Sequence, residues 1–238
     1  MESANTVGYS TQDVTGGKLY CVALQFGDVG ASGDLASIAK LATSGITAGV
    51  YDTMDTDAPC LMFYNGVGYD RYYYISDAYD AGGNPVTAWA DAGGDEATAQ
   101  KALGTGCWLR IPEGKATAGS ITASGEVSEA DTSTINIANG LTLASSPYPV
   151  ALNMSKVTTS GLVAGVYDTM DTDAPCIMIY NGVGYDRYYY ISDAYDAGGN
   201  PVTAWADAGG DAVTGDIAEV GEAFWVRSGS AGTLTIAK

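Results

Sequence analysis

The stretch AGVYDTMDTDAPCLMFYNGVGYDRYYYISDAYDAGGNPVTAWADAGGD, residues 48–95, occurs a second time at residues 164–211. The copies are offset by 116 residues (164 minus 48), and 46 of the 48 aligned residues are identical. The two exceptions keep an apolar side chain: Leu61/Ile177 and Phe63/Ile179. Packing tolerates change at a surface better than in a core. Near-identity at both kinds of position therefore indicates either a recent duplication or a surface that works in two copies.

The repeat divides the chain of 238 residues into two tandem modules, which we place at residues 1–126 and 127–238. The boundary falls in the small polar segment SGEVSEADTS, residues 124–133, which is typical of a linker. Each module is long enough to bury a core of its own.

The composition predicts an all-β fold. The chain has 32 Gly and 17 Tyr and is rich in Thr, Ser and Val, which favour strands joined by tight turns over helices. Within the repeat, residues 60–64 form an apolar run, residues 65–68 (NGVG) a hairpin turn, and residues 69–76 a returning strand. We expect two tandem β-sandwich-like modules with one short helix each, at residues 34–43 and 151–159.

The charge of the chain excludes two classes of partner. There are 28 acidic residues against 10 Lys plus Arg, a net charge of −18, which repels nucleic-acid phosphates and anionic lipid. Insertion into a membrane is not expected either, because no apolar run approaches the ~20 residues that span a bilayer.

A Trp-x-Arg strand closes each module, at residues 106–111 (GCWLRI) and 223–228 (AFWVRS). Because side chains alternate along a strand, Trp108 and Trp225 point away from the apolar residues beside them. All four Trp and all four Arg sit at duplicated positions. They either anchor the core and neutralise nearby Asp, or they contact a ligand.

The four cysteines divide into two kinds. Cys60 and Cys176 are equivalents inside apolar runs, where we expect buried free thiols. Cys21 and Cys107 are both absent from the second module, and they lie on strands near the ends of the first. For an exported protein they are candidates for a disulfide, and in a reducing compartment they would be small buried apolar groups.

Aspartates gather in the loops of both repeats, together with Gly. Such loops offer the several oxygen ligands on a flexible backbone that Ca²⁺ requires, although no EF-hand pattern is present. The alternative is that these residues form turns and keep the protein soluble. The candidate calcium ligands are Asp52, Asp55, Asp57, Asp77 and Asp80 in the first module and Asp168, Asp171, Asp173, Asp193 and Asp196 in the second.

Nothing in the sequence points to catalysis, so we expect no enzyme. The chain has no His, which removes the commonest general base and most transition-metal sites. The duplicated Asp loops give no reason to nominate an acid and a base at a defined separation.

Three segments carry a resemblance to a known group. The opening ESANTVGY (residues 2–9), the middle YNGVGYD (residues 64–70) and the closing GEAFWVRS (residues 221–228) resemble a large set of exported bacterial β-rich proteins of unknown function. The resemblance implies export, with a leader removed before the mature opening. We therefore expect an extracellular or cell-surface location.

Two functions of different classes follow. The first is a self-assembling subunit of an extracellular filament, tube or surface layer. Modules that stack head to tail leave complementary surfaces at the chain ends, so the chain would bind copies of itself and form an open homopolymer. Pairing of the modules by a two-fold would remove that route. Edge strands at residues 6–11 and 233–237, which carry no Pro, are the expected polymer contacts.

The alternative function is a secreted adhesin or carbohydrate-binding protein with two near-identical surfaces that bind glycans with avidity. Aromatic side chains beside Asp and Asn suit sugar recognition. The candidate ligand or assembly contacts are Tyr72, Tyr74, Trp89, Tyr188, Tyr190 and Trp205.

Overall fold

The computed structural model describes residues 6–28 and 35–238, and these residues form a mostly β structure, as predicted. The strands up to residue 126 are β1 (Val7–Val14), β2 (Lys18–Ala23), β3 (Leu35–Ser37), β4 (Ala42–Ser44), β5 (Cys60–Tyr64), β6 (Tyr69–Tyr79), β7 (Pro85–Ala90), β8 (Gln100–Ala102), β9 (Gly106–Ile111) and β10 (Gly119–Glu126). The later strands are β11 (Thr132–Ile137), β12 (Gly140–Ser145), β13 (Leu152–Asn153), β14 (Val157–Ser160), β15 (Cys176–Tyr180), β16 (Tyr185–Tyr195), β17 (Pro201–Ala206), β18 (Asp216–Ala218), β19 (Ala223–Ser228) and β20 (Gly232–Ala237).

The helices are short. Two α-helices of a single turn, α1 (Met54–Asp57) and α2 (Met170–Asp173), lie inside the two copies of the repeat. The 3₁₀ helices are η1 (Ile38–Lys40), η2 (Tyr51–Thr53), η3 (Met154–Lys156) and η4 (Tyr167–Thr169). In the part of the chain that the structure describes, no helix is long and apolar enough to cross a membrane.

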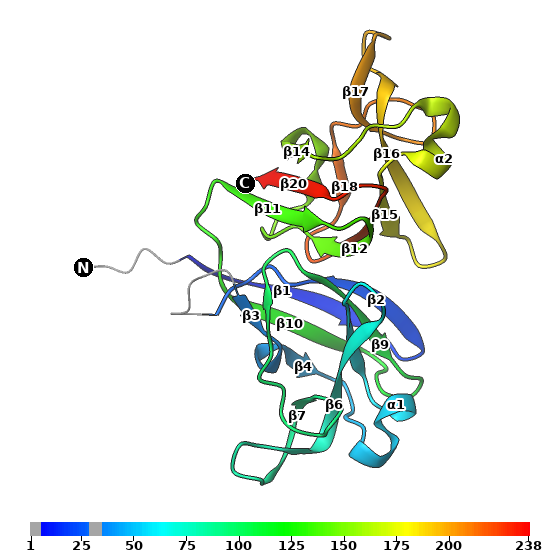
Figure 1. Ribbon diagram of the computed structural model, residues 1–238. Helices are drawn as coiled ribbons and strands as arrows, with labels where there is room; N and C mark the ends of the chain where they lie inside the picture. Colours follow the sequence, from blue (N-terminus) through cyan, green and yellow to red (C-terminus); the bar gives the residue numbers. More distant parts are fainter. Residues whose placement is uncertain (1–5, 29–34) are drawn as a thin grey trace, which may run out of the picture.

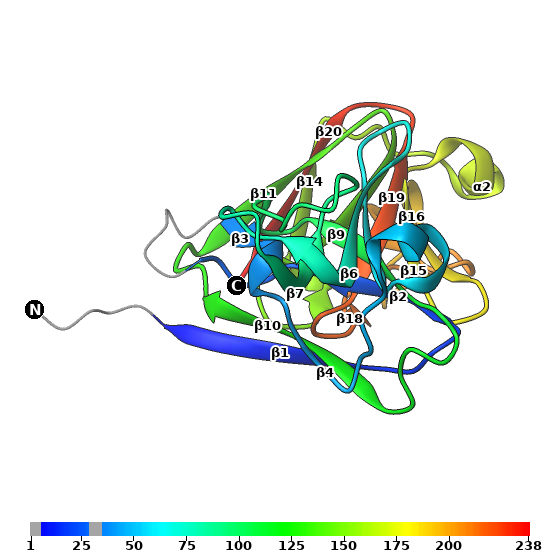
Figure 2. The ribbon, with the colours of Figure 1, turned by 90° about the horizontal axis from the view of Figure 1, so that it is seen from below.

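The strands form the same set of sheets before and after residue 126, and we call these two parts the first half and the second half. The first half has a five-stranded sheet in the order β2-β9-β5-β6-β7 and a three-stranded sheet in the order β1-β10-β4. The second half repeats both orders, as β12-β19-β15-β16-β17 and β11-β20-β14. Figure 1 shows the second half above the first, and Figure 2 shows β1, β10 and β4 together along one side.

The hairpin of the repeat forms where the sequence predicts it. In the first half β5 and β6 pair antiparallel from Cys60↔Tyr73 to Tyr64↔Tyr69, and β5 also pairs with the Trp-x-Arg strand β9. Gly66, in the turn, has φ of 98°, a left-handed conformation that only glycine adopts without strain. Turn chemistry and apolar alternation together therefore set the register of this hairpin.

The five-stranded sheet of the first half carries apolar side chains on both faces. On the inner face Leu61, Phe63 and Leu109 pack into the core that the three-stranded sheet closes. The opposite face, which we call the outer face, carries Trp108 and Cys21. This distribution explains why both faces of β6 are rich in Tyr.

Two expectations of secondary structure are wrong. Residues 35–43 and 151–159 do not form one short helix each; they form short strands around the three-residue helices η1 and η3, and Asp34 lies outside the described residues. Strand pairing with β8, β10, β18 and β20 replaces the helical hydrogen bonds. Residues 233–237 are also not a free edge, because β20 pairs with β11 on one side and β14 on the other.

Candidate binding site between the two halves

The two halves meet through the outer faces of their five-stranded sheets, and the backbone contacts are reciprocal. Ala23 N donates to Gly221 O, and Ser145 N donates to Gly104 O. Ser145 occupies in β12 the position that Ala23 occupies in β2, and Gly221 precedes β19 as Gly104 precedes β9. Each half therefore presents the same positions to the other, as in the interface of a two-fold dimer.

The aromatic contacts across the interface are reciprocal as well. The Tyr64 ring meets the Trp225 ring edge-on at 5.1 Å between centroids, and Trp108 meets Tyr180 at 5.2 Å. Such edge-to-face pairs stabilise an interface beyond the area that they bury. The outward Trp side chains predicted from the alternation thus dock one half on the other, and they complete a cluster with Cys21, Leu143 and Ala223.

Beside these contacts the two sheets leave an apolar groove of about 430 Å³. Four pairs of corresponding side chains line it: Leu19/Leu141, Met62/Met178, Tyr69/Tyr185 and Trp108/Trp225. We call this set the central groove. Its rim is open to solvent, because Leu19 and Leu141 are 38% and 40% exposed and the two Tyr are each 39% exposed. Their partial burial raises the pKa of both Tyr69 and Tyr185.

A second hollow, of about 680 Å³, adjoins the central groove and shares Leu19 with it. It lies between β2, the β15–β16 turn at Gly182, and the loop at Glu219–Glu222. Its lining is more polar than that of the groove and includes Gln12, Lys18, Glu219 and Glu222. We call it the side hollow.

The predicted ligand contacts lie elsewhere, and we correct them here. Tyr72 and Tyr74 are half-buried on the inner face, and Trp89 is buried in the same core. Their copies Tyr188, Tyr190 and Trp205 pack in the core of the second half. The reason is the register of β6 with β7 and of β16 with β17, which pairs Tyr74 with Trp89 and Tyr190 with Trp205 on the inner face.

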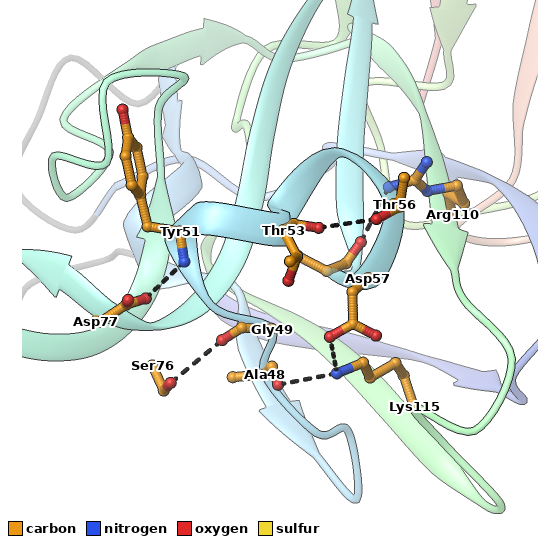
Figure 3. Close-up of polar contacts among 11 residues, drawn as sticks. Ala48, Gly49, Tyr51, Thr53, Thr56, Asp57, Ser76, Asp77, Arg110 and Lys115 are labelled. Atoms are coloured by element: carbon orange, nitrogen blue, oxygen red, sulfur yellow. Dashed lines mark hydrogen bonds and ion pairs between the residues drawn. The ribbon is translucent and has the colours of Figure 1, made fainter.

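The predicted calcium ligands do not converge. Among the described residues no group of three Asp, Glu, Cys or His side chains is placed to hold a metal ion. Instead the carboxylates serve the local structure (Figure 3): Asp57 pairs with Lys115 Nζ at 2.7 Å, and Asp77 accepts from Tyr51 N at 2.9 Å. The second half repeats the Asp77 contact with the same residue types, because Asp193 accepts from Tyr167 N.

Four of the remaining candidate carboxylates also make local contacts, and the other three, Asp52, Asp168 and Asp173, lie in the short helices η2, η4 and α2. Asp55 and Asp171 accept from the hydroxyls of Tyr73 and Tyr189. Asp80 caps its turn by accepting from Asn84 N and Gly82 N, and these bonds lower the pKa of its carboxyl group. Asp196 makes the equivalent bonds. The turn-forming role of Asp therefore accounts for the contacts of Asp80 and Asp196, while Asp55, Asp57 and Asp171 bind side chains of other segments.

The predicted disulfide between Cys21 and Cys107 is wrong, since both thiols are free. Their strands are neighbours, but Cys21 pairs with Trp108 whereas Cys107 pairs with Val22. The two side chains therefore point to opposite faces of the sheet. Cys60 and Cys176 are buried free thiols, as predicted, and burial raises the pKa of each to about 11.

Comparison of the chain with known protein families, with characterised proteins and with solved structures gives no match. The resemblance to exported β-rich proteins therefore stays an expectation drawn from the sequence.

Proposed function

We propose that the protein is a non-catalytic binding protein that takes a ligand with an apolar body in the central groove. The observation that carries this proposal is the set of four corresponding apolar pairs that line the groove and stay partly open to solvent. Soluble proteins rarely leave a hollowed apolar surface uncovered unless it binds something. With the resemblance to exported proteins, the proposal extends to a role outside the cell or at its surface.

The reciprocal contact between the halves favours this class over an open polymer. Head-to-tail stacking would leave two complementary surfaces at the ends of the chain, whereas the halves use the same positions on each other and close the contact. Of the two expected polymer contacts only β1 remains an edge strand, and the 219–222 loop lies close to it at Ser10.

The groove differs in character from a glycan site. Its lining consists of Leu, Met, Trp and Tyr, without the Asp and Asn that would bind sugar hydroxyls. The ligand class that fits is an alkyl or aryl chain rather than a carbohydrate, so we replace the glycan partner by an apolar one.

Calorimetric titration with decan-1-ol tests the proposal. Leu19→Glu and Leu141→Glu place a charge on the rim at positions that are already about 40% exposed, so the fold should tolerate them. Burying that charge against the alkyl chain should weaken binding at least tenfold. Val163→Glu is the control, because it adds the same charge at a residue that is 70% exposed and outside the groove.

Binding of decan-1-ol that all three variants leave unchanged would contradict the proposal, and so would the absence of any binding to the wild-type protein.

A further inference from the structure

Glu222 is a half-buried carboxylate without an ion-pair partner among the described residues. Its Oε2 atom accepts from Glu219 N at 3.0 Å, and the two carboxylates whose charges act on it, Glu219 and Asp186, are negative. Among the described residues it forms no ion pair, although five other carboxylates do. Burial, together with these like charges, raises the pKa of Glu222. A carboxylate in such surroundings is stabilised by an incoming positive charge.

The position is acidic in the second half alone. Glu222 pairs with Val22 across the interface, and the corresponding bridge on the other side joins Thr105 to Ala144. At this position the backbone pairing is the same on both sides of the interface, but only the second half carries a charged side chain. The packing of the interface therefore does not require the Glu222 carboxylate, because a neutral Thr fills the same structural role.

We propose that the side hollow binds the ammonium group of a cationic amphipath, whose apolar body lies in the central groove. This inference rests on the proposed function and names the chemical class of the ligand. Leu19 lines both spaces, so a single chain can pass over it from one to the other. The side hollow is large enough for a bulky ammonium group.

Two further features of the hollow favour a cation. The Tyr180 ring lines it, and aromatic faces attract ammonium groups. The net charge of −18 attracts cations to the whole molecule and repels amphipathic anions. Lys18 also lines the hollow, but it is exposed and makes no ion pair with Glu222, so it leaves the carboxylate available.

The test compares three probes with the same ten-carbon chain and different ends: decyltrimethylammonium and decanoate, each below its micellar concentration, and decan-1-ol below its solubility limit. Titration of the full chain, followed by calorimetry and Trp fluorescence, should rank the ammonium probe first and the carboxylate last. Glu222→Gln should weaken binding of the ammonium probe about tenfold and leave binding of decan-1-ol unchanged. Glu113→Gln, which removes the same charge from an exposed loop, should change neither.

The outcomes separate the two proposals. If none of the probes binds, the proposed function fails. If decan-1-ol binds and Glu222→Gln has no effect on the ammonium probe, the central groove stands and the cation site is overturned. Tightest binding of decanoate would overturn it as well. A melting temperature for each variant establishes that it is folded, so that loss of binding is assigned to the site.

Discussion

The two copies of the repeat have nearly the same sequence but different surroundings. Their local structure is the same: the hairpins, the one-turn helices and the capped Asp turns agree residue by residue. Their contacts with the rest of the chain differ. Trp89 Nε1 donates to Leu41 O at 3.1 Å, whereas Trp205 Nε1 is buried and has no hydrogen-bond partner among residues 6–28 and 35–238. The repeated sequence therefore determines the local structure of the hairpin, and the residues outside the repeat determine which hydrogen bonds hold it to the rest of the chain.

Charge pairing shows the same contrast. In the first half Lys115 pairs with Asp57 and Lys101 with Asp70. The corresponding Asp173 and Asp186 have no Lys partner among the described residues. The ion pair that the two copies share is that of Arg with Asp, Arg71–Asp55 and Arg187–Asp171. Because the repeats supply matched positions, each difference between the halves can be tested against its own internal control.

The largest effect is expected where the halves touch most closely. Gly106 is the counterpart of Ala223, and a Cβ atom at Gly106 would lie 2.7 Å from Ala223 Cβ and 2.7 Å from Ala144 O. Gly106→Ala should therefore cost about 2 kcal/mol of unfolding free energy, through overpacking against a backbone that cannot yield easily. Chemical denaturation monitored by Trp fluorescence measures this loss.

The exchange of the two residues sharpens that prediction. The double variant Gly106→Ala with Ala223→Gly removes one of the two close contacts, so it should recover part of the loss, and a double-mutant cycle isolates the coupling. Additive effects would mean that the two positions do not meet in solution and that the reciprocal interface is absent.

The strands of the repeat could be predicted because their information is local. The NGVG turn and the apolar run at residues 60–64 specify the hairpin without help from other elements. The helix expected at residues 34–43 is absent because the strands that pair with this segment, β8 and β10, lie 63–67 and 76–80 residues further along the chain, and no local pattern predicts them.

The central groove could be predicted only in part. The outward alternation of Trp108 and Trp225 was visible in the sequence, and it marks the correct face. Met62 and Tyr69 read as ordinary strand residues, because their exposure depends on how one half docks on the other. The alternation of side chains along a strand does not show how two sheets dock on each other, so the central groove could be identified only from the structure.

An intermediate effect is expected from Lys115–Asp57, one of the ion pairs that the first half has and the second half lacks among the described residues. Lys115 lies in a loop, residues 112–118, that is shorter in the second half, residues 229–231, so Asp173 has no equivalent partner. Asp57→Asn should cost about 1 kcal/mol, because it leaves a Lys ammonium that is only 14% exposed without its counter-ion. Asp173→Asn should change the free energy of unfolding by less than ~0.5 kcal/mol.

Thermal melting of the two Asn variants at low and at high salt checks this pair. The cost at Asp57 should persist in part at high salt, since Lys115 is mostly buried. Equal costs at the two positions would show that the local turn, and not the Lys115 contact, determines the value of this carboxylate.

The smallest effect on stability is expected for Glu222→Gln, and this substitution should stabilise the protein, whereas Gly106→Ala and Asp57→Asn should destabilise it. The raised pKa means that the folded protein holds the Glu222 proton more tightly than the unfolded chain, whose reference value is 4.5. Ionisation therefore lowers stability as the pH rises from about that value through the raised pKa, and the deficit is constant above it. Glu222→Gln should consequently stabilise the protein at neutral pH, by at most about 0.5 kcal/mol because solvent screens a half-exposed group.

The same variant should be without effect on stability at a pH well below 4.5, where Glu222 is protonated in both states. Glu219, Asp186 and Cys21 interact electrostatically with the carboxyl group, and Lys18 lines the same hollow, so Glu219→Gln is the control for the general field of the hollow. Denaturation curves at both pH values measure the difference. A Glu222→Gln variant that is less stable at neutral pH would mean that the carboxylate already has a favourable partner. In that case Glu222, where the first half has Thr105, would contribute to the stability of the fold and would not indicate a ligand site.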